Sequence, residues 1–219
     1  MSQRFDTVLF DLDGTLLDTA PDLANALNAV LESNGRAPLP FERIRPVVSN
    51  GGAALIQLGF GLDATHVDFP PLRQQFLDHY QQHLAEHTRL FPGMEDVLLH
   101  IETQGLTWGV VTNKPAWLTD PLLEALQLDK RAAGIVSGDT VKQCKPHPAP
   151  LLHACKLIGS TPQRCLFVGD ALRDIQAGLS ARMSTLVALF GYIVEADCPE
   201  SWGADALIET PQEILPWLK

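Results

Sequence analysis

The sequence predicts an α/β fold in which helices cover both faces of a parallel β-sheet and a helical segment is inserted into the core. Short apolar segments, amphipathic segments between them, and one long stretch with helical periodicity alone predict this fold. A chain of 219 residues is longer than a minimal domain needs and short for two full ones. A core with an insertion therefore suits the length, and the hydrophobic fraction of 46% is ample for a packed interior.

Short apolar segments are expected to form the strands. They are bounded by glycine or polar residues and lie at 7–10, 108–111, 134–136, 165–168 and 185–188. Polar residues do not alternate with apolar ones inside them, which predicts strands buried on both faces, as in a parallel sheet.

Amphipathic segments between these strands are expected to be the helices of the core, at 94–103, 120–126, 148–157 and 173–180. Pro121 and Pro148 lie near the starts of two of them, where a missing N–H costs little. Strands that alternate with helices predict a doubly wound, Rossmann-like sheet.

Residues 17–87 break this alternation and are expected to form a helical domain inserted after the first strand. The helical patterns cover 22–32, 41–48, 52–58 and 71–86, and 61–71 is expected to be a loop. The core domain would then consist of residues 1–16 and 88–219.

The charge of the chain favours a small substrate. Lys and Arg number 16 against 26 Asp and Glu, a net charge of −10. An acidic surface repels nucleic acid and anionic membranes, so we expect a small diffusible partner, no nucleic acid and no membrane. A monomer or a homodimer is expected.

The expected location is the cytoplasm. The acidic N-terminal stretch leaves no room for a signal peptide, and no window approaches the roughly 20 apolar residues of a membrane span. The cysteines are widely spaced and include no Cys-x-x-Cys pair, so neither a disulfide framework nor a zinc site is indicated.

Acidic and basic side chains follow several predicted strands at the point where each strand ends. Asp11 and Asp13 come after the first strand, and residues two apart in an extended segment point to the same side. The other strand ends carry Thr112, Asn113 and Lys114, then Lys145, and then Asp170 with Asp174 four residues on. In a parallel sheet all of these groups emerge at one edge, where ligands generally bind.

This set of residues suits phosphoryl transfer. A carboxylate approaching a phosphate dianion is repelled, so a cation and a lysine must offset the charge. Asp11, Asp13 and Asp170 are the expected Mg²⁺ ligands, with Asp174 behind them. Lys145 would neutralise the remaining charge, and the Thr112 hydroxyl would hydrogen-bond the phosphoryl group.

Two carboxylates then divide the chemistry between them. Asp11 is the expected nucleophile and becomes an aspartyl phosphate. Asp13 is the expected general acid and base, which protonates the leaving alkoxide and later deprotonates the attacking water.

These motifs resemble the haloacid dehalogenase-like superfamily. Its phosphatases carry Asp-x-Asp-Gly-Thr, a Ser or Thr after the second strand, a Lys before Pro, and a Gly-Asp followed by a further acid, all present here in order. The resemblance implies a magnesium-dependent phosphatase whose helical insertion is a mobile cap over the substrate. Ala171 departs from the pattern, because many relatives have Asp or Ser there, which implies an altered environment behind the metal.

Some motifs resemble particular branches of the superfamily. Segments 112–115, 145–151 and 190–192 are similar to the phosphoglycolate phosphatase branch. Segments 90–94, 108–111 and 202–205 are more similar still to bacterial N-acetylmuramic acid 6-phosphate phosphatases. The resemblance therefore implies 2-phosphoglycolate or N-acetylmuramic acid 6-phosphate as the substrate.

The expected substrate contacts come from the core and the insertion. Arg45 offers a guanidinium for a carboxylate, and the glycines of Ser49-Asn50-Gly51-Gly52 expose backbone N–H groups. The full set of expected contacts is Thr15, Arg45, Asn50, Gly51, Asn113 and Lys114.

Several interpretations stay open. His79, His83 and His87 are spaced four apart, which fits a metal site or, more simply, a solvated helix face. His147 shapes its loop or contacts the substrate.

Other functions are also compatible with parts of the pattern. A 2-haloacid dehalogenase would use Asp11 without a metal but lacks the second acid. A phosphomutase would keep every core motif, and a phospho-accepting signalling receiver would leave Asp13 unexplained.

Overall fold

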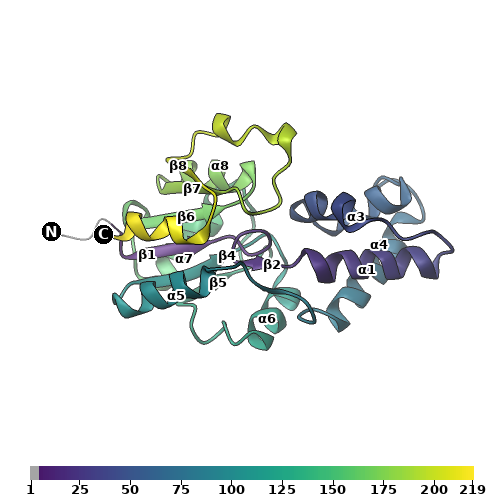
Figure 1. Cartoon of the computed structure of the whole chain (residues 1–219), viewed down its shortest axis with the longest axis horizontal. Coiled ribbons are helices and arrows are strands. Elements are labelled where there is room, and N and C mark those ends of the chain that lie inside the picture. The colour runs from purple at the N-terminus through teal and green to yellow at the C-terminus, as the bar shows by residue number, and fades with distance from the viewer. Residues whose placement is uncertain (1–4) are drawn as a thin grey trace.

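The computed structural model describes residues 5–219. Residues 1–4, which belong to the acidic N-terminal stretch where no signal peptide is expected, lie outside the described residues. Its main sheet is parallel, with strand order β5-β4-β1-β6-β7-β8 (Figure 1). The strands are β1 (Thr7–Phe10), β4 (Thr107–Val111), β5 (Gly134–Val136), β6 (Cys165–Gly169), β7 (Ser184–Ala188) and β8 (Ala206–Ile208). This sheet confirms the predicted fold class.

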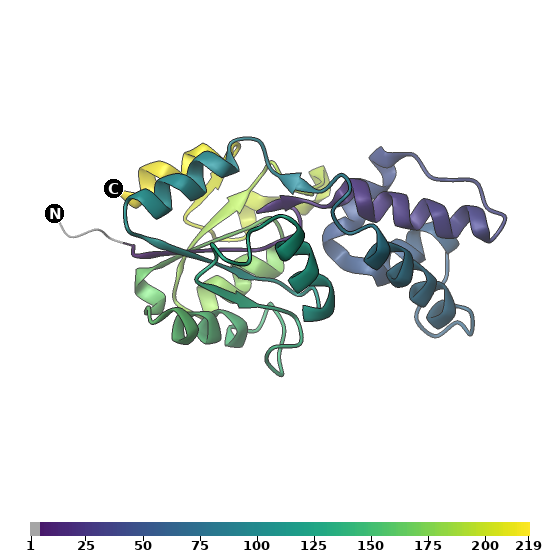
Figure 2. The ribbon, with the colours of Figure 1, turned by 90° about the horizontal axis from the view of Figure 1, so that it is seen from below.

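Helices cover both faces of the sheet. α5 (Met94–Thr103) and the 3₁₀ helix η5 (Pro211–Leu218) lie on one face, and α7 (Ala149–Ile158) and α8 (Leu172–Ser180) lie on the other (Figure 2). Successive residues of a strand point to opposite faces, so Val8 packs in the cluster that includes α5 while Leu9 packs in the cluster that includes α7. Burial on both faces explains why the strands lack polar alternation.

Several elements of the core differ from the prediction, and the 3₁₀ helix η5 was not predicted. The strand β8 was not predicted, because it is short and its residues are only partly buried before Ile208. The helix α6 (Ala116–Ala125) begins earlier than residue 120, and Pro121 lies inside it. The N–H of Ala116 donates to Asp139 Oδ1 at 2.8 Å, so a residue distant in sequence caps the start of this helix.

The helices within residues 17–87 lie together beyond the carboxyl ends of the strands (Figure 1). They are α1 (Ala20–Ser33), α2 (Phe41–Ile44), the 3₁₀ helix η1 (Arg45–Asn50), α3 (Gly51–Phe60) and α4 (Phe69–Gln82). Buried side chains such as Leu27, Leu55 and Phe76 fill the space between α1, α3 and α4. Segment 41–48 was predicted as one helical stretch. It consists of two elements, because the α-helix changes to 3₁₀ geometry at Arg45, just before Pro46.

The prediction of one helix over 71–86 was wrong at both ends. α4 begins at Phe69, with prolines in its first turn, and ends at Gln82. Beyond it, the carboxylate of Asp22 accepts hydrogen bonds from the backbone N–H groups of His87 and Thr88. Of the three histidines only His79 lies within α4, because His83 follows its last residue and His87 lies further on, so the predicted helix face of three histidines does not form.

A small antiparallel pair of strands joins the main sheet to the helices of 17–87. β2 (Leu17–Asp18) pairs with β3 (Arg89–Leu90). Neither strand was predicted, because each is too short to leave an apolar pattern. Within residues 5–219, no helix has the length and apolar character of a membrane-spanning segment.

Candidate active site

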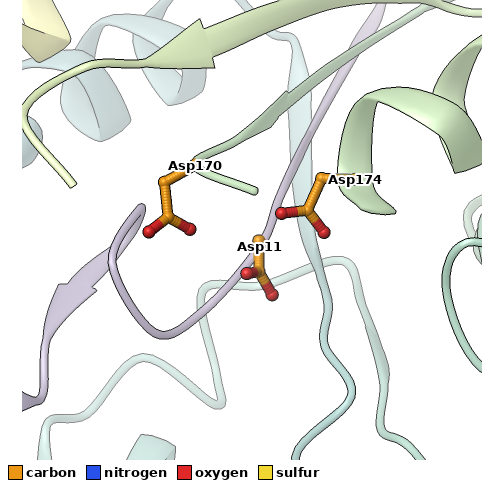
Figure 3. Close-up of side chains that lie close together, drawn as sticks. All are labelled: Asp11, Asp170 and Asp174. Carbon is orange, nitrogen blue, oxygen red and sulfur yellow. The ribbon is translucent and has the colours of Figure 1, made fainter. Parts of the chain in front are cut away.

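Three acidic side chains meet at the carboxyl ends of the central strands. Asp11 follows β1, Asp170 follows β6, and Asp174 lies in the first turn of α8 (Figure 3). One oxygen from each carboxylate lies within 4.8 Å of the others, and all three residues are buried. The predicted convergence of strand ends thus brings Asp11 and Asp170 together, and Asp174 belongs to the same cluster.

Glycines make room for these carboxylates. Gly14 has a φ of +88°, and a Cβ there would overlap the carboxylate of Asp170. A Cβ at Gly169 would overlap Asp174, and one at Gly191 would overlap Asp170. The sequence therefore allows the chain to approach the cluster closely on several sides.

Lys145 is the cation at the centre of the cluster. Its Nζ lies 2.7 Å from Asp11 Oδ1 and 2.8 Å from Asp174 Oδ1, and it donates to the Val111 carbonyl at 2.6 Å. Burial alone would lower the pKa of Lys145, but the carboxylates of Asp11 and Asp174 outweigh it and raise the pKa above its ordinary value. Lys145 is therefore held in its charged form.

The cluster has an excess of negative charge. Burial raises the pKa of Asp11 to about 6, although the neighbouring Lys145 opposes this shift. Burial, and then the charges of Asp11 and Asp174, raise the pKa of Asp170 to about 7. Lys145 contacts two of the three buried carboxylates, and hard oxygen donors of this kind suit a divalent cation. The residues present therefore fit the metal that the motifs imply.

The Asp13 side chain does not belong to the group of carboxylates formed by Asp11, Asp170 and Asp174. Its Oδ1 accepts hydrogen bonds from the Thr19 hydroxyl at 2.6 Å and from Lys114 Nζ at 2.9 Å. These two contacts hold the Asp13 carboxylate. It still borders the same cavity as Asp11.

The residues that follow β4 border the cavity and fix the loop that carries Lys145. The Asn113 side chain donates to the Lys145 carbonyl at 2.9 Å and accepts from the Lys145 N–H at 3.0 Å. The Thr112 hydroxyl accepts from the N–H of Lys114 at 3.1 Å. Asn113 therefore fixes the backbone from which Lys145 reaches the acids.

A cavity of about 720 Å³ lies between this edge of the sheet and the helices of 17–87. Most of the predicted site residues border it, namely Asp11, Asp13, Asn50, Gly51, Thr112, Asn113 and Lys114.

Lys145, Asp170 and Asp174 lie in the acid cluster, and three other singled-out residues border neither the cavity nor Lys145. Arg45 donates to the Phe190 carbonyl at 3.2 Å and stacks on the Tyr192 ring, outside the cavity. Thr15 is fully buried and donates to Asp170 Oδ1 at 3.3 Å, so it supports the acid cluster. His147 is exposed and its Nδ1 accepts from the Ala149 N–H at 3.1 Å, which is a loop-shaping contact.

The sequence did not single out several residues that border the cavity. Tyr80 and Arg73 come from α4, Trp117 from α6, and Arg173 from α8.

Ser49 links the helices to the acid cluster. Its hydroxyl donates to Asp170 Oδ2 at 2.9 Å, and its carbonyl accepts from Arg173 at 2.6 Å. The segment around Ser49 had been predicted to contact the substrate, and no sequence signal indicated its contact with Asp170.

Comparisons with known proteins show the family of this chain. The profile of haloacid dehalogenase-like hydrolases matches residues 8–188. A Pseudomonas aeruginosa protein named N-acetylmuramic acid 6-phosphate phosphatase is 44% identical over 97% of this chain and 94% of its own length. A Xylella fastidiosa protein named phosphoglycolate phosphatase is 45% identical over 94% of this chain and 89% of its own length.

A solved structure has the same fold. The crystal structure of a predicted phosphoglycolate phosphatase from Haemophilus somnus superimposes with a TM-score of 0.88 over 100% of both chains, at 29% identity.

Proposed function

The chain belongs to the haloacid dehalogenase-like hydrolases, and from this premise we propose that it is a magnesium-dependent phosphomonoesterase acting through an aspartyl phosphate on Asp11. The family expected from the motifs is confirmed, and the chain is a phosphatase of that family. One observation carries the mechanism: Asp11 lies at the floor of the cavity, in contact with Lys145 and beside Asp170 and Asp174.

The first step transfers the phosphoryl group to Asp11. A carboxylate oxygen of Asp11 attacks phosphorus, the bond from phosphorus to the ester oxygen breaks, and Asp13 gives its proton to the leaving alkoxide. In the second step Asp13 takes a proton from water, which attacks phosphorus and releases inorganic phosphate and the free Asp11 carboxylate. Lys145 and the Thr112 hydroxyl stabilise charge on the transferring group.

Asp11, Asp170 and Asp174 would hold the magnesium ion. When bound, Mg²⁺ supplies positive charge that offsets the repulsion between the phosphate and the carboxylates. Ala171 leaves the side-chain support of Asp170 to Thr15 and Ser49.

The size of the cavity favours a sugar phosphate as the substrate. A volume of about 720 Å³ lies within the range of about 300–1,000 Å³ typical of ligand pockets. The two-carbon chain of 2-phosphoglycolate would fill little of it. Trp117, which is 42% exposed, borders the cavity and offers a flat apolar surface to a sugar ring. We therefore favour N-acetylmuramic acid 6-phosphate, the compound in the name of the Pseudomonas relative.

The helices of residues 17–87 would act as a cap over the core formed by residues 1–16 and 88–219. Their side chains border the cavity opposite Asp11, so they would contact the part of the substrate that leaves. The reaction is then set by the core and the substrate by the cap.

A phosphate-release assay tests this function. We expect magnesium-dependent release of inorganic phosphate from N-acetylmuramic acid 6-phosphate, more slowly from 2-phosphoglycolate, and none with a chelator present. Readdition of Mg²⁺ should restore the rate, because the acidic cluster binds the ion reversibly. Equal rates with chelator would contradict the metal mechanism, and inactivity on both compounds would contradict the substrate assignment.

The space at Gly14 gives a second prediction. In Gly14→Ala the new methyl group would displace Asp170, so we expect the Mg²⁺ concentration for half-maximal activity to rise about 10-fold. Gly35→Ala is the matched control, because Gly35 also has a positive φ, +72°, but no atom within 4 Å of its Cβ position. Titration of activity with Mg²⁺ measures both. Equal Mg²⁺ requirements in the two variants would show that Asp170 tolerates the methyl group.

A further inference from the structure

Tyr80 connects the helical segment to the proposed acid and base. It lies on α4, its ring is 1% exposed, and it stacks against Phe76 with 6.3 Å between ring centroids. Its hydroxyl lies 2.8 Å from Lys114 Nζ. The same Nζ lies 2.9 Å from Asp13 Oδ1, so a continuous polar chain runs from α4 to Asp13.

The Lys114 side chain is placed by two partners. It is 6% exposed, and its Nζ also lies 4.6 Å from the centre of the Tyr80 ring. Burial alone would lower the pKa of Lys114, but Asp13 and Tyr80 outweigh it and raise the pKa, so the ammonium group stays charged. The hydrogen bonds to Tyr80 and Asp13 fix the position of the buried Lys114 ammonium group, and Tyr80 supplies one of the two.

The two donors to Asp13 both reach the same oxygen. Lys114 Nζ and the Thr19 hydroxyl each donate to Oδ1, and within residues 5–219 no donor reaches Oδ2. A proton on the Asp13 carboxyl group therefore belongs on Oδ2, because Oδ1 is already occupied by two donors.

We propose that Tyr80 is a positioning residue: through Lys114 it orients Asp13 so that Oδ2 carries the proton delivered to the leaving group. This inference rests on the proposed function of Asp13. It also means that the acid is correctly oriented only when α4 packs against the edge of the sheet, because Tyr80 belongs to the helical segment.

Two substrates with different leaving groups test the proposal. The alkoxide released from N-acetylmuramic acid 6-phosphate needs a proton, whereas the nitrophenolate released from 4-nitrophenyl phosphate does not. We would measure kcat/KM, which covers the phosphorylation of Asp11 but not the later hydrolysis common to both substrates. General acid catalysis raises a rate about 10² to 10⁴-fold. Asp13→Asn should therefore lower kcat/KM by that factor on the sugar phosphate and not on the nitrophenyl ester.

Tyr80→Phe removes only the hydroxyl and keeps the buried ring. We expect kcat/KM to fall about 10-fold on the sugar phosphate, part of the effect of a general acid, and less than about 2-fold on the nitrophenyl ester. In an Asp13→Asn background, Tyr80→Phe should have no further effect on the sugar phosphate, because both changes act on one step.

Thr7→Val is the matched control. It also removes one buried hydroxyl, which donates to Asp6 Oδ1 at 2.9 Å at the start of β1, at the other end of the strand from Asp13. Any change in kcat/KM that this control causes should be equal for the two substrates. The proposal would be overturned if Tyr80→Phe lowered kcat/KM equally for both substrates or for neither. It would also be overturned if Tyr80→Phe lowered kcat/KM further in the Asp13→Asn background. A wild-type enzyme inactive on both substrates would instead contradict the proposed function.

Discussion

Asp11→Asn is expected to lower kcat for phosphate release at least about 10⁴-fold, because an amide cannot attack phosphorus and no other group replaces it. Asp11 is the carboxylate that borders the cavity and also contacts Lys145, at 2.7 Å. The variant should fold, since Asn has nearly the same shape as Asp and Lys145 keeps its contact with Asp174.

Mass spectrometry and circular dichroism check this prediction. Rapidly quenched wild-type enzyme should carry a phosphoryl group on the peptide that contains Asp11, and the variant should carry none. The far-ultraviolet spectra of the two proteins should agree. Residual turnover within 10-fold of wild type, or a phosphorylated residue elsewhere, would reject Asp11 as the nucleophile.

Lys145→Met should have the second largest effect, on stability as well as on activity. Lys145 is 3% exposed and contacts both Asp11 and Asp174. Removing it leaves buried carboxylates without their cation, which typically costs about 3–5 kcal/mol. Urea unfolding with a chelator present measures the loss, and saturating Mg²⁺ should recover part of it.

Lys142→Met is the matched control for this experiment. Lys142 precedes Lys145 in the same segment but is exposed, so its free energy of unfolding should change by less than about 0.5 kcal/mol. A loss below about 1 kcal/mol in Lys145→Met would mean that the carboxylates do not depend on this lysine in the folded state.

The elements of the core could be predicted where local pattern determines structure. Segment 7–10 is apolar throughout because β1 is central and buried on both faces, and that burial leaves a direct signal in the sequence. The start of α6 left no such signal, because the group that caps Ala116 is Asp139, which is distant in the chain. The segment after α4 likewise depends on a distant residue, because the Asp22 carboxylate accepts hydrogen bonds from the N–H groups of His87 and Thr88.

The same limit applies to the site. Asp11, Lys145 and Asp170 could be predicted, because each follows a strand of one parallel sheet and the topology brings strand ends together. Side chains of the helical segment were harder to predict, because their positions depend on how that segment packs on the core, although Asn50 and Gly51 do border the cavity. Arg45 was expected to contact the substrate and lies outside the cavity, while Tyr80, which the sequence did not single out, reaches Lys114.

The pairing of β2 with β3 has a consequence for how such enzymes diversify. The chain leaves the sheet at Leu17–Asp18 and returns at Arg89–Leu90, so the exit and the return lie side by side. A segment whose two ends are adjacent can be lengthened, shortened or exchanged without stretching the strands on either side. The β2–β3 pair is therefore a place where evolution can replace the helical segment while the sheet and Asp11 stay unchanged.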